Sequence, residues 1–414
     1  MENKITKSAF KLASLLLFAA ILGVTACTED PEETLYRDDL IGPDYPAPVI
    51  ESVNPPNEAL AGITEITISG QNFSPNAGYN LVFFDSELGD VLSASENEIV
   101  VRAPAYADTA IDLKIAVRKV EDFSNVYNYK LNPAVAQYDY QNSLPRFFNI
   151  AVNGMGEIFA SGADKTPNYN IFKLLLPDDF QVYASSGVQG GIADMRFGPG
   201  NQLFQLQSGA SSSLLSYITD GGGNRERFVR ITVPSSAFDF DGQGNIWVGS
   251  PDNIINYITY PDGEITEFPI DFSVSWVKVF EGYLYASGSV NDEKGIWRFQ
   301  LNNGSLGEAE KYFDFSGNFP DTDISSFVMS ADGLIYAALT SDTEDDQIVV
   351  ITSSNSVEVL YPELILSPVS SPLVWGAGTK FYYTRRQLID DAVVLSLVAV
   401  DLEKPGAVYY GRTL

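Results

Sequence analysis

One pattern of apolar and polar positions recurs from residue 133 to the end of the chain. Each copy has an apolar strand, a turn with glycine, and a strand in which an apolar residue precedes an aromatic one. That apolar residue stands at positions 158, 203, 246, 284, 335 and 381, at spacings of 45, 43, 38, 51 and 46. A repeat of about 40–50 residues made of short strands is typical of a four-stranded propeller blade.

Each repeat also supplies a third and a fourth strand. The expected third strands are residues 171–176, 214–218, 254–258, 296–301, 348–351 and 395–400. Turn residues such as Asp262 and Gly263 lead on to expected fourth strands at 265–269 and 312–315. Residues 133–414 hold six such repeats of 47 residues each, so the sequence predicts a six-bladed β-propeller. Five or seven blades stay open at this stage.

A segment of shorter strands, residues 46–132, precedes the repeats. Ile66 and Ile68 alternate with polar residues, and further short apolar runs follow. These runs lie at residues 80–84, 99–102, 113–117 and 126–131. Seven short strands of this kind predict an immunoglobulin-like β-sandwich. The chain has one cysteine, so no intramolecular disulfide can form and packing alone must hold the fold.

Three motifs in this segment resemble the IPT/TIG family. They are Ile50-x-x-Val53-x-Pro55, Ile66-x-Ile68-x-Gly70-x-Asn72-Phe73, and the stretch from Ser93 to Pro104. The resemblance implies a spacer or interaction domain without catalysis. Gly70 and Phe73 are therefore expected to serve the fold and not to contact a ligand.

The first 26 residues have the pattern of a secretory signal. Lys4, Lys7 and Lys11 precede an apolar run at 12–24, which is too short to cross a hydrocarbon core of about 30 Å as a helix. Small residues then lead to Cys27. This ending resembles a bacterial lipoprotein signal, which implies that residues 1–26 are removed and Cys27 is lipidated. A free or buried thiol is the alternative interpretation.

An acidic and proline-containing tether, residues 27–45, follows the predicted anchor. Its acidic cluster at 28–33 resembles the export signal that sends Bacteroidota lipoproteins to the outer face of the outer membrane. The resemblance implies an outer-membrane lipoprotein that faces the cell exterior. A solvated, self-repelling tether explains the same residues without an export role.

Charge and composition restrict the function. The formal net charge of −29 argues against nucleic acid, whose phosphates require basic contacts, and against docking on anionic lipid. The chain has no histidine, which excludes Ser-His-Asp and Cys-His catalysis and histidine-based zinc sites. Catalysis would have to use carboxylates, tyrosine, lysine or a hard cation. The sequence therefore favours binding over enzymatic activity.

Candidate ligand-binding residues lie where the loops lead into the first strand of each blade. They are Arg146, Asn149, Asp194, Arg196, Trp276, Asp323 and Trp375. An aromatic platform beside Arg, Asn and Asp suits a sugar ring, which needs an apolar face and hydrogen-bond partners. Packing between blades is the alternative for Trp276 and Trp375. Small serines such as Ser235 and Ser326 have a similar alternative, because blades converge at the axis.

The stretch from Gly244 to Val248 resembles NHL-repeat and gluconolactonase-like propellers, which speaks to fold and not to activity. The loops between second and third strands are acidic. They contain Asp164, Asp252, Asp292, Glu293, Asp342, Glu344, Asp345, Asp346, Asp390 and Asp391. Solvated loops explain this acidity, and no EF-hand spacing is present. No cofactor or metal site is predicted, and Ca²⁺ stays an alternative.

Three functional hypotheses follow. The first is a non-catalytic surface lipoprotein whose propeller captures a ligand, with a glycan as the expected class and the sandwich as a spacer. The second is a Ca²⁺-dependent, lactonase-like hydrolase. The third is a protein-binding scaffold that partners an outer-membrane transporter.

Overall fold

The structure is a computed structural model that describes residues 45–408. Residues 141–145, 164–168, 186–191, 292, 318, 341–346, 353–355, 371 and 390–391 are outside the description. The predicted signal peptide and Cys27 therefore lie outside the described residues. Within the described part, no helix is long and apolar enough to cross a membrane. The described chain divides into two compact units, one of residues 45–59 and 64–131 and one of residues 60–63 and 132–408.

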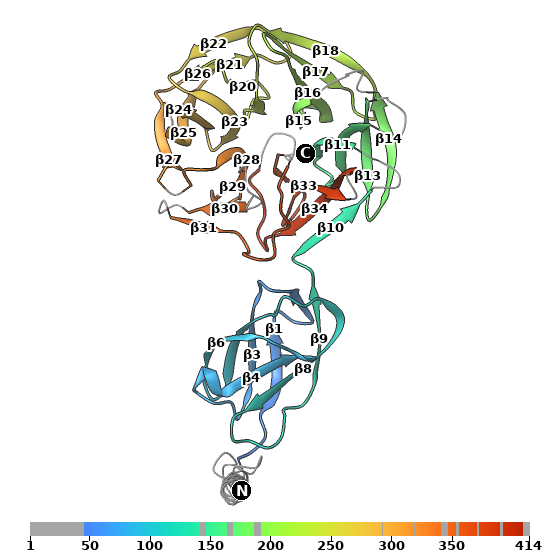
Figure 1. Cartoon of the computed structure of the whole chain (residues 1–414), viewed down its shortest axis with the longest axis vertical. Coiled ribbons are helices and arrows are strands. Elements are labelled where there is room, and N and C mark those ends of the chain that lie inside the picture. Colours follow the sequence, from blue (N-terminus) through green and yellow to red (C-terminus); the bar gives the residue numbers. More distant parts are fainter. Residues whose placement is uncertain are drawn as a thin grey trace, which may run out of the picture. The chain divides into compact units, whose positions relative to one another are not determined.

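The first unit is a sandwich of two antiparallel sheets (Figure 1). One sheet has the order β1-β3-β7-β6, with β1 Val49–Asn54, β3 Glu65–Gln71, β7 Glu98–Arg102 and β6 Asp90–Ala94. The other has the order β2-β9-β8-β4-β5, with β2 Glu58–Leu60, β9 Tyr127–Asn132, β8 Asp108–Val117, β4 Asn80–Phe84 and β5 Glu87–Leu88. A short 3₁₀ turn, η1 (Ala77–Tyr79), precedes β4. The predicted immunoglobulin-like sandwich is confirmed.

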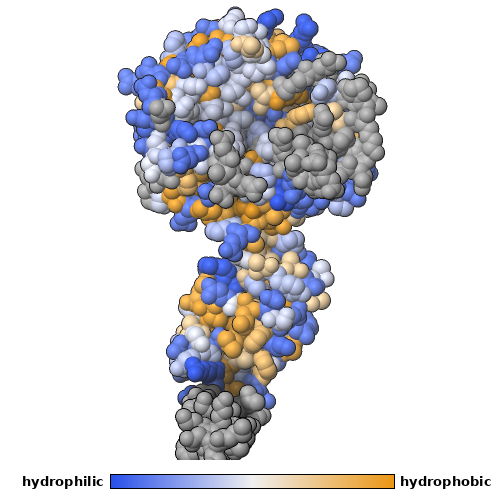
Figure 2. All heavy atoms as spheres, viewed as in Figure 1, coloured by the Kyte–Doolittle hydropathy of each residue, from blue (hydrophilic) through white to orange (hydrophobic). Residues whose placement is uncertain are grey.

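Alternation along the strands builds the sandwich core. Ile66 and Ile68 of β3 and Val82 and Phe84 of β4 are fully buried, while the residues between them face outward or lie half-buried. Gly70 is required by close packing, because a Cβ there would lie 1.9 Å from the Val49 carbonyl oxygen. Figure 2 shows apolar residues exposed on part of this sandwich, in orange.

The second unit is a six-bladed propeller whose first strands surround a common axis (Figure 1). Blade one has β11 Arg146–Val152, β12 Ile158–Ala163, β13 Tyr169–Leu175 and β14 Asp179–Ser185. Blade two has β15 Ile192–Gly198, β16 Gln202–Ser208, β17 Ser213–Ile218 and β18 Gly223–Ile231. Blade three has β19 Ala237–Phe240, β20 Ile246–Ser250, β21 Ile254–Ile258 and β22 Ile265–Pro269. A 3₁₀ turn, η2 (Pro199–Asn201), joins β15 to β16.

The remaining three blades follow the same order. Blade four has β23 Ser273–Phe280, β24 Tyr283–Val290, β25 Glu293–Asn302 and β27 Glu310–Asp314, and the short β26 Ser305–Leu306 also pairs with β25. Blade five has β28 Asp323–Met329, β29 Ile335–Thr340, β30 Gln347–Ile351 and β31 Val357–Val359. Blade six has β32 Val374–Trp375, β33 Lys380–Ile389 and β34 Ala392–Asp401. The six-blade prediction is confirmed.

The ring closes through a strand from the other end of the propeller. β10 (Val135–Asp139) pairs antiparallel with β34 and becomes the outer strand of blade six, as Figure 1 shows. Val135 lies opposite Val400, and Asp139 lies opposite Ser396. Because β10 comes before blade one in the chain, this pairing joins the two ends of the propeller sequence.

Candidate functional site

The blade register places one residue of each first strand opposite the aromatic residue of the repeat. For example, Arg196 lies opposite Phe204, and Asp239 lies opposite Trp247. Around the ring these six residues are Ala151, Arg196, Asp239, Lys278, Val328 and Val374. The charged members come from three consecutive blades, which are blades two, three and four.

These charged residues form an axial ion cluster with Asp194. Arg196 Nε lies 3.1 Å from Asp194 Oδ2 and 3.9 Å from Asp239 Oδ1. Lys278 Nζ lies 3.3 Å from Asp239 Oδ2, and the Val279 amide donates to the same oxygen at 2.8 Å. The cluster carries two positive and two negative charges, and each side chain is at most 9% exposed. Balanced pairing is what makes buried charges tolerable.

Burial sets the protonation behaviour of the cluster. It lowers the pKa of Lys278 to about 8, with Arg196 acting in the same direction and Asp239 opposing both. Burial also raises the pKa of Asp194, against the opposing effect of Arg196. The Lys278 ammonium is consequently the member of the cluster that loses its charge first as the pH rises above neutral.

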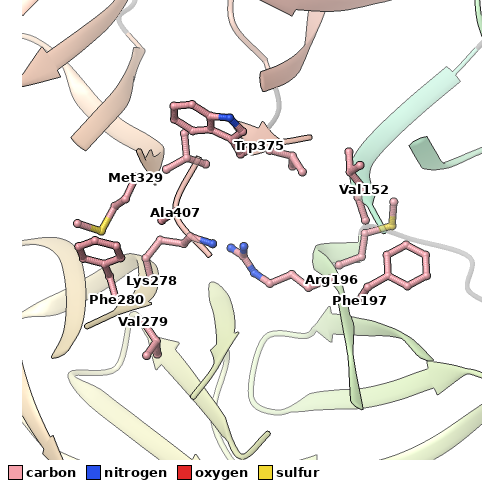
Figure 3. Close-up of a pocket in the computed structure, with 13 residues that line it drawn as sticks. Val152, Arg196, Phe197, Lys278, Val279, Phe280, Met329, Trp375 and Ala407 are labelled. Atoms are coloured by element: carbon pink, nitrogen blue, oxygen red, sulfur yellow. The ribbon is translucent and has the colours of Figure 1, made fainter. Parts of the chain in front are cut away.

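The cavity at the axis is small. Its volume is about 30 Å³, and its lining includes Arg196, Lys278, Trp375 and Ala407. Figure 3 shows Arg196 and Lys278 reaching toward each other into this space from opposite sides. The Ala407 amide donates to the Met329 carbonyl at 2.8 Å, which fixes the segment near the chain end against blade five. A space of this size holds about one water molecule and no sugar ring.

Besides Arg196, whose Nε donates to the Phe238 carbonyl at 2.5 Å, three of the predicted ligand-binding residues connect neighbouring blades. Asn149 Nδ2 donates to the Ile192 carbonyl at 2.7 Å, which joins blades one and two. Asp194 accepts from the Phe238 amide at 3.1 Å, and Trp276 Nε1 donates to the Phe327 carbonyl at 3.0 Å. All three are buried, and the Arg196 guanidinium lies 5.1 Å from the centre of the Trp276 ring. The packing between blades that the sequence left as an alternative describes these contacts.

Of the remaining predicted site residues, Trp375 lines the axial cavity together with Arg196. Trp375 is buried against Tyr336, with ring centres 5.4 Å apart. Asp323 is exposed and pairs with Lys294 at 2.8 Å. Arg146 lies at the start of β11, and its side chain is outside the described part of the chain. The structure therefore brings Asp194, Arg196 and Trp276 together but leaves Asp323 apart, and a ligand-binding role for the set stays a prediction.

The acidic loops give no metal-ligand geometry in the described part. Among those residues, no three Asp, Glu, Cys or His side chains come together to hold a metal ion. Two of the loop residues lie within the described part of the chain. Asp252 is exposed, and Glu293 pairs with Lys311 at 3.1 Å. The other loop residues considered for Ca²⁺ all lie outside the described residues: Asp164, Asp292, Asp342, Glu344, Asp345, Asp346, Asp390 and Asp391.

An open pocket of about 410 Å³ lies on blade two instead. Its polar lining comes from Gln207, Ser208, Ser212, Ser213, Arg227 and Arg230. These residues belong to the end of β16, the loop that follows it, the first position of β17, and β18. The pocket thus offers amide, hydroxyl and guanidinium groups on the second-to-third loop of one blade, away from the axial ion cluster.

Sequence reasoning missed the polar residues that dominate both places. Asp239 and Lys278 complete the axial ion cluster. A charged residue at the same position of consecutive apolar first strands could have indicated this cluster from the sequence. Arg227 and Arg230 line the blade-two pocket. Their signal was three arginines within the nine residues of β18 in a strongly acidic chain.

Comparison with solved structures finds distant similarity over most of the chain. An auxiliary nutrient binding protein from Bacteroides ovatus has 13% identity and a TM-score of 0.47, covering 87% of this chain and 100% of that one. A gluconolactonase from Xanthomonas campestris has 12% identity and a TM-score of 0.47, covering 71% and 91%. Virginiamycin B lyase from Staphylococcus aureus has 14% and 0.44, covering 65% and 99%. These values transfer no activity to this chain.

A search of curated proteins finds no match. One domain family does match the sequence. Its span is residues 48–131, which includes the two sheets of the sandwich from β1 to β9 apart from the last residue of β9. The sandwich is an IPT/TIG domain.

Proposed function

We propose that this chain is a non-catalytic binding lipoprotein of the outer membrane, anchored through Cys27 and facing the cell exterior. The propeller captures a glycan, and the IPT/TIG domain acts as a spacer. The anchor has its own test. Cells grown with radiolabelled palmitate should label the wild-type protein and not Cys27→Ala, and equal labelling of both would contradict the anchor.

The blade-two pocket is the observation that carries the binding proposal. Sugar hydroxyls need hydrogen-bond donors and acceptors in one concave surface, and Gln207, Ser212 and Arg230 supply both. Its volume of about 410 Å³ suits one or two sugar units. The axial cavity of about 30 Å³ is not an alternative glycan site, because the ion cluster and Trp375 surround it and leave no room for a sugar.

Native affinity electrophoresis tests glycan capture. The protein, expressed from residue 28 so that no lipid is added, is run through gels cast with neutral and acidic polysaccharides. Retardation in at least one gel, reduced by Ser212→Ala and Arg230→Gln, is expected. Asp271→Asn is the matched control, because this exposed residue lies between blades three and four and outside the pocket. Free migration through every gel would overturn the proposal.

A further inference from the structure

A β-bulge gathers the three arginines of β18 on one face of blade two. In the pairing of β17 with β18, Ile218 lies opposite Arg225, Ser216 opposite Arg227 and Leu214 opposite Arg230. The register shifts between Leu215 and Ser216, where Phe228 is the additional residue. Without this extra residue Arg227 and Arg230 would point to opposite faces, because strand side chains alternate. We call Arg225, Arg227 and Arg230 the arginine row.

The arginine row carries positive charge without a carboxylate. Within the described residues, none of its members forms an ion pair, although the chain contains 54 acidic residues. Arg298 of blade four shows the usual arrangement, since its guanidinium donates to both oxygens of Glu310 at 2.8 and 2.9 Å. Glu226 lies between Arg225 and Arg227 in sequence but on the opposite face of the strand, where it accepts from the Tyr217 hydroxyl at 2.8 Å.

Neutral groups hold two of the three side chains in place. Arg225 Nη1 donates to Gln207 Oε1 at 3.4 Å, and Arg230 Nη2 donates to Ser212 Oγ at 2.9 Å. Burial lowers the pKa of Arg225, and the neighbouring charge of Arg227 adds to this. Like charges are therefore kept close together at a cost in stability, which a bound anion would relieve.

A buried amide extends the same polar surface inward. Gln205 lies opposite Ser216, which in turn lies opposite Arg227, so the three form one cross-strand row. Gln205 is 1% exposed, and neither of its amide atoms has a hydrogen-bond partner among the described residues. Buried amides are nearly always paired, so Gln205, one strand further inward than Ser216, is an exception on the same face of the blade.

We propose that the arginine row binds the anionic group of an acidic saccharide, a carboxylate or a sulfate. Arg227 and Arg230 line the pocket and present planar forks of donors that fit such oxyanions in a bidentate manner. Ser212 and Gln207 bind hydroxyl groups of the same ligand. This inference rests on the proposed glycan capture and adds the chemical class of the glycan.

Isothermal titration calorimetry with three matched oligosaccharides tests the proposal. The ligands are a uronic acid oligomer, its carboxyl-reduced neutral counterpart, and a sulfated oligomer of the same length. The protein should bind at least one acidic oligomer and bind the neutral counterpart at least about tenfold more weakly, since charge-assisted bonds are the strong ones. Binding of the uronate alone identifies a carboxylate, and binding of the sulfated oligomer alone identifies a sulfate.

The double variant Arg227→Gln/Arg230→Gln should weaken binding of the acidic oligomer by about tenfold or more. Its matched control is Arg102→Gln/Arg298→Gln, which removes the same charge from arginines that pair with Glu65 and Glu310, and it should bind as the wild type does. Arg227→Lys keeps the charge but not the planar fork and should lose part of the affinity. This milder variant keeps the test valid if the double variant does not fold.

The failures of the two proposals are distinguishable. Equal binding of the acidic oligomers and the neutral counterpart, or acidic binding that survives the double variant, would overturn the anion site. Retardation by neutral polysaccharides alone would leave glycan capture standing and remove the anion inference. No interaction in calorimetry or in any gel would remove both.

Discussion

Two groups of charged residues in the same propeller differ in burial and in charge pairing. The axial ion cluster is buried, has as many carboxylates as cations, and connects the first strands of blades two, three and four. The arginine row lies on the outer strand of blade two and has no ion pair within the described residues. The first strands that carry the axial ion cluster are mostly apolar and buried, whereas β18 is polar and largely exposed.

The difference separates charges that serve the fold from charges available to a ligand. A buried carboxylate such as Asp239 is neutralised from within, because leaving it uncompensated would cost several kcal/mol. A half-exposed arginine stays hydrated, so leaving it without a counter-charge costs little free energy. The following experiments test this separation, from the largest expected effect to the smallest.

Replacing the central carboxylate of the axial ion cluster should have the largest effect. Asp239→Asn leaves Lys278 and Arg196 buried without their shared counter-charge. The free energy of unfolding should fall by about 3–5 kcal/mol, measured by chemical denaturation. Asp262→Asn, on an exposed turn of blade three, is the control and should stay within about 0.5 kcal/mol of the wild type. A loss below about 1 kcal/mol would contradict a structural role for the cluster.

The cluster should also produce a pH dependence of stability. The pKa of Lys278 is about 8 in the folded protein, against an ordinary value of 10.5. Between these values the unfolded chain binds more protons than the folded protein, so the free energy of unfolding rises with pH. The stability of the wild type minus that of Lys278→Met should therefore increase by up to about 3 kcal/mol from pH 8 to pH 10.5. Denaturation curves at several pH values check this, and parallel profiles would argue against it.

The arginine row should matter least for stability. The double variant Arg227→Gln/Arg230→Gln should unfold within about 1 kcal/mol of the wild type, because partly exposed residues contribute little. Relief of like-charge repulsion works in the stabilising direction. The measurement is the same denaturation experiment at neutral pH. A decrease in the free energy of unfolding as large as that of Asp239→Asn would show that these arginines serve the fold, as the axial ion cluster does.

Local alternation was sufficient to predict much of the fold. The expected strands at 254–258 and 265–269 coincide with β21 and β22, because each is a short apolar run bounded by turn residues. The pairing of β10 with β34 could not be predicted in this way. It joins segments far apart in the sequence, and neither segment carries a local signal for its partner.

The candidate site was less predictable for a related reason. Asp194 and Arg196 were recognised as polar residues near the axis, but burial against Trp276 and Asp239 depends on how neighbouring blades approach each other. The arginines of β18 are visible in the sequence as a cluster of charge. Their common face is not visible, because it depends on a single bulge at Phe228 that the alternation of β18 does not indicate.

Closure of the ring by β10 has a consequence for synthesis. Val135 leaves the ribosome long before its partner Val400 is synthesised. Until then β10 has no strand to pair with, and the finished blades form an open arc with apolar surfaces exposed at both ends. Such long-range pairing is slow and vulnerable to aggregation. A chain that closes its ring in this way therefore gains from being held unfolded until β34 has been made.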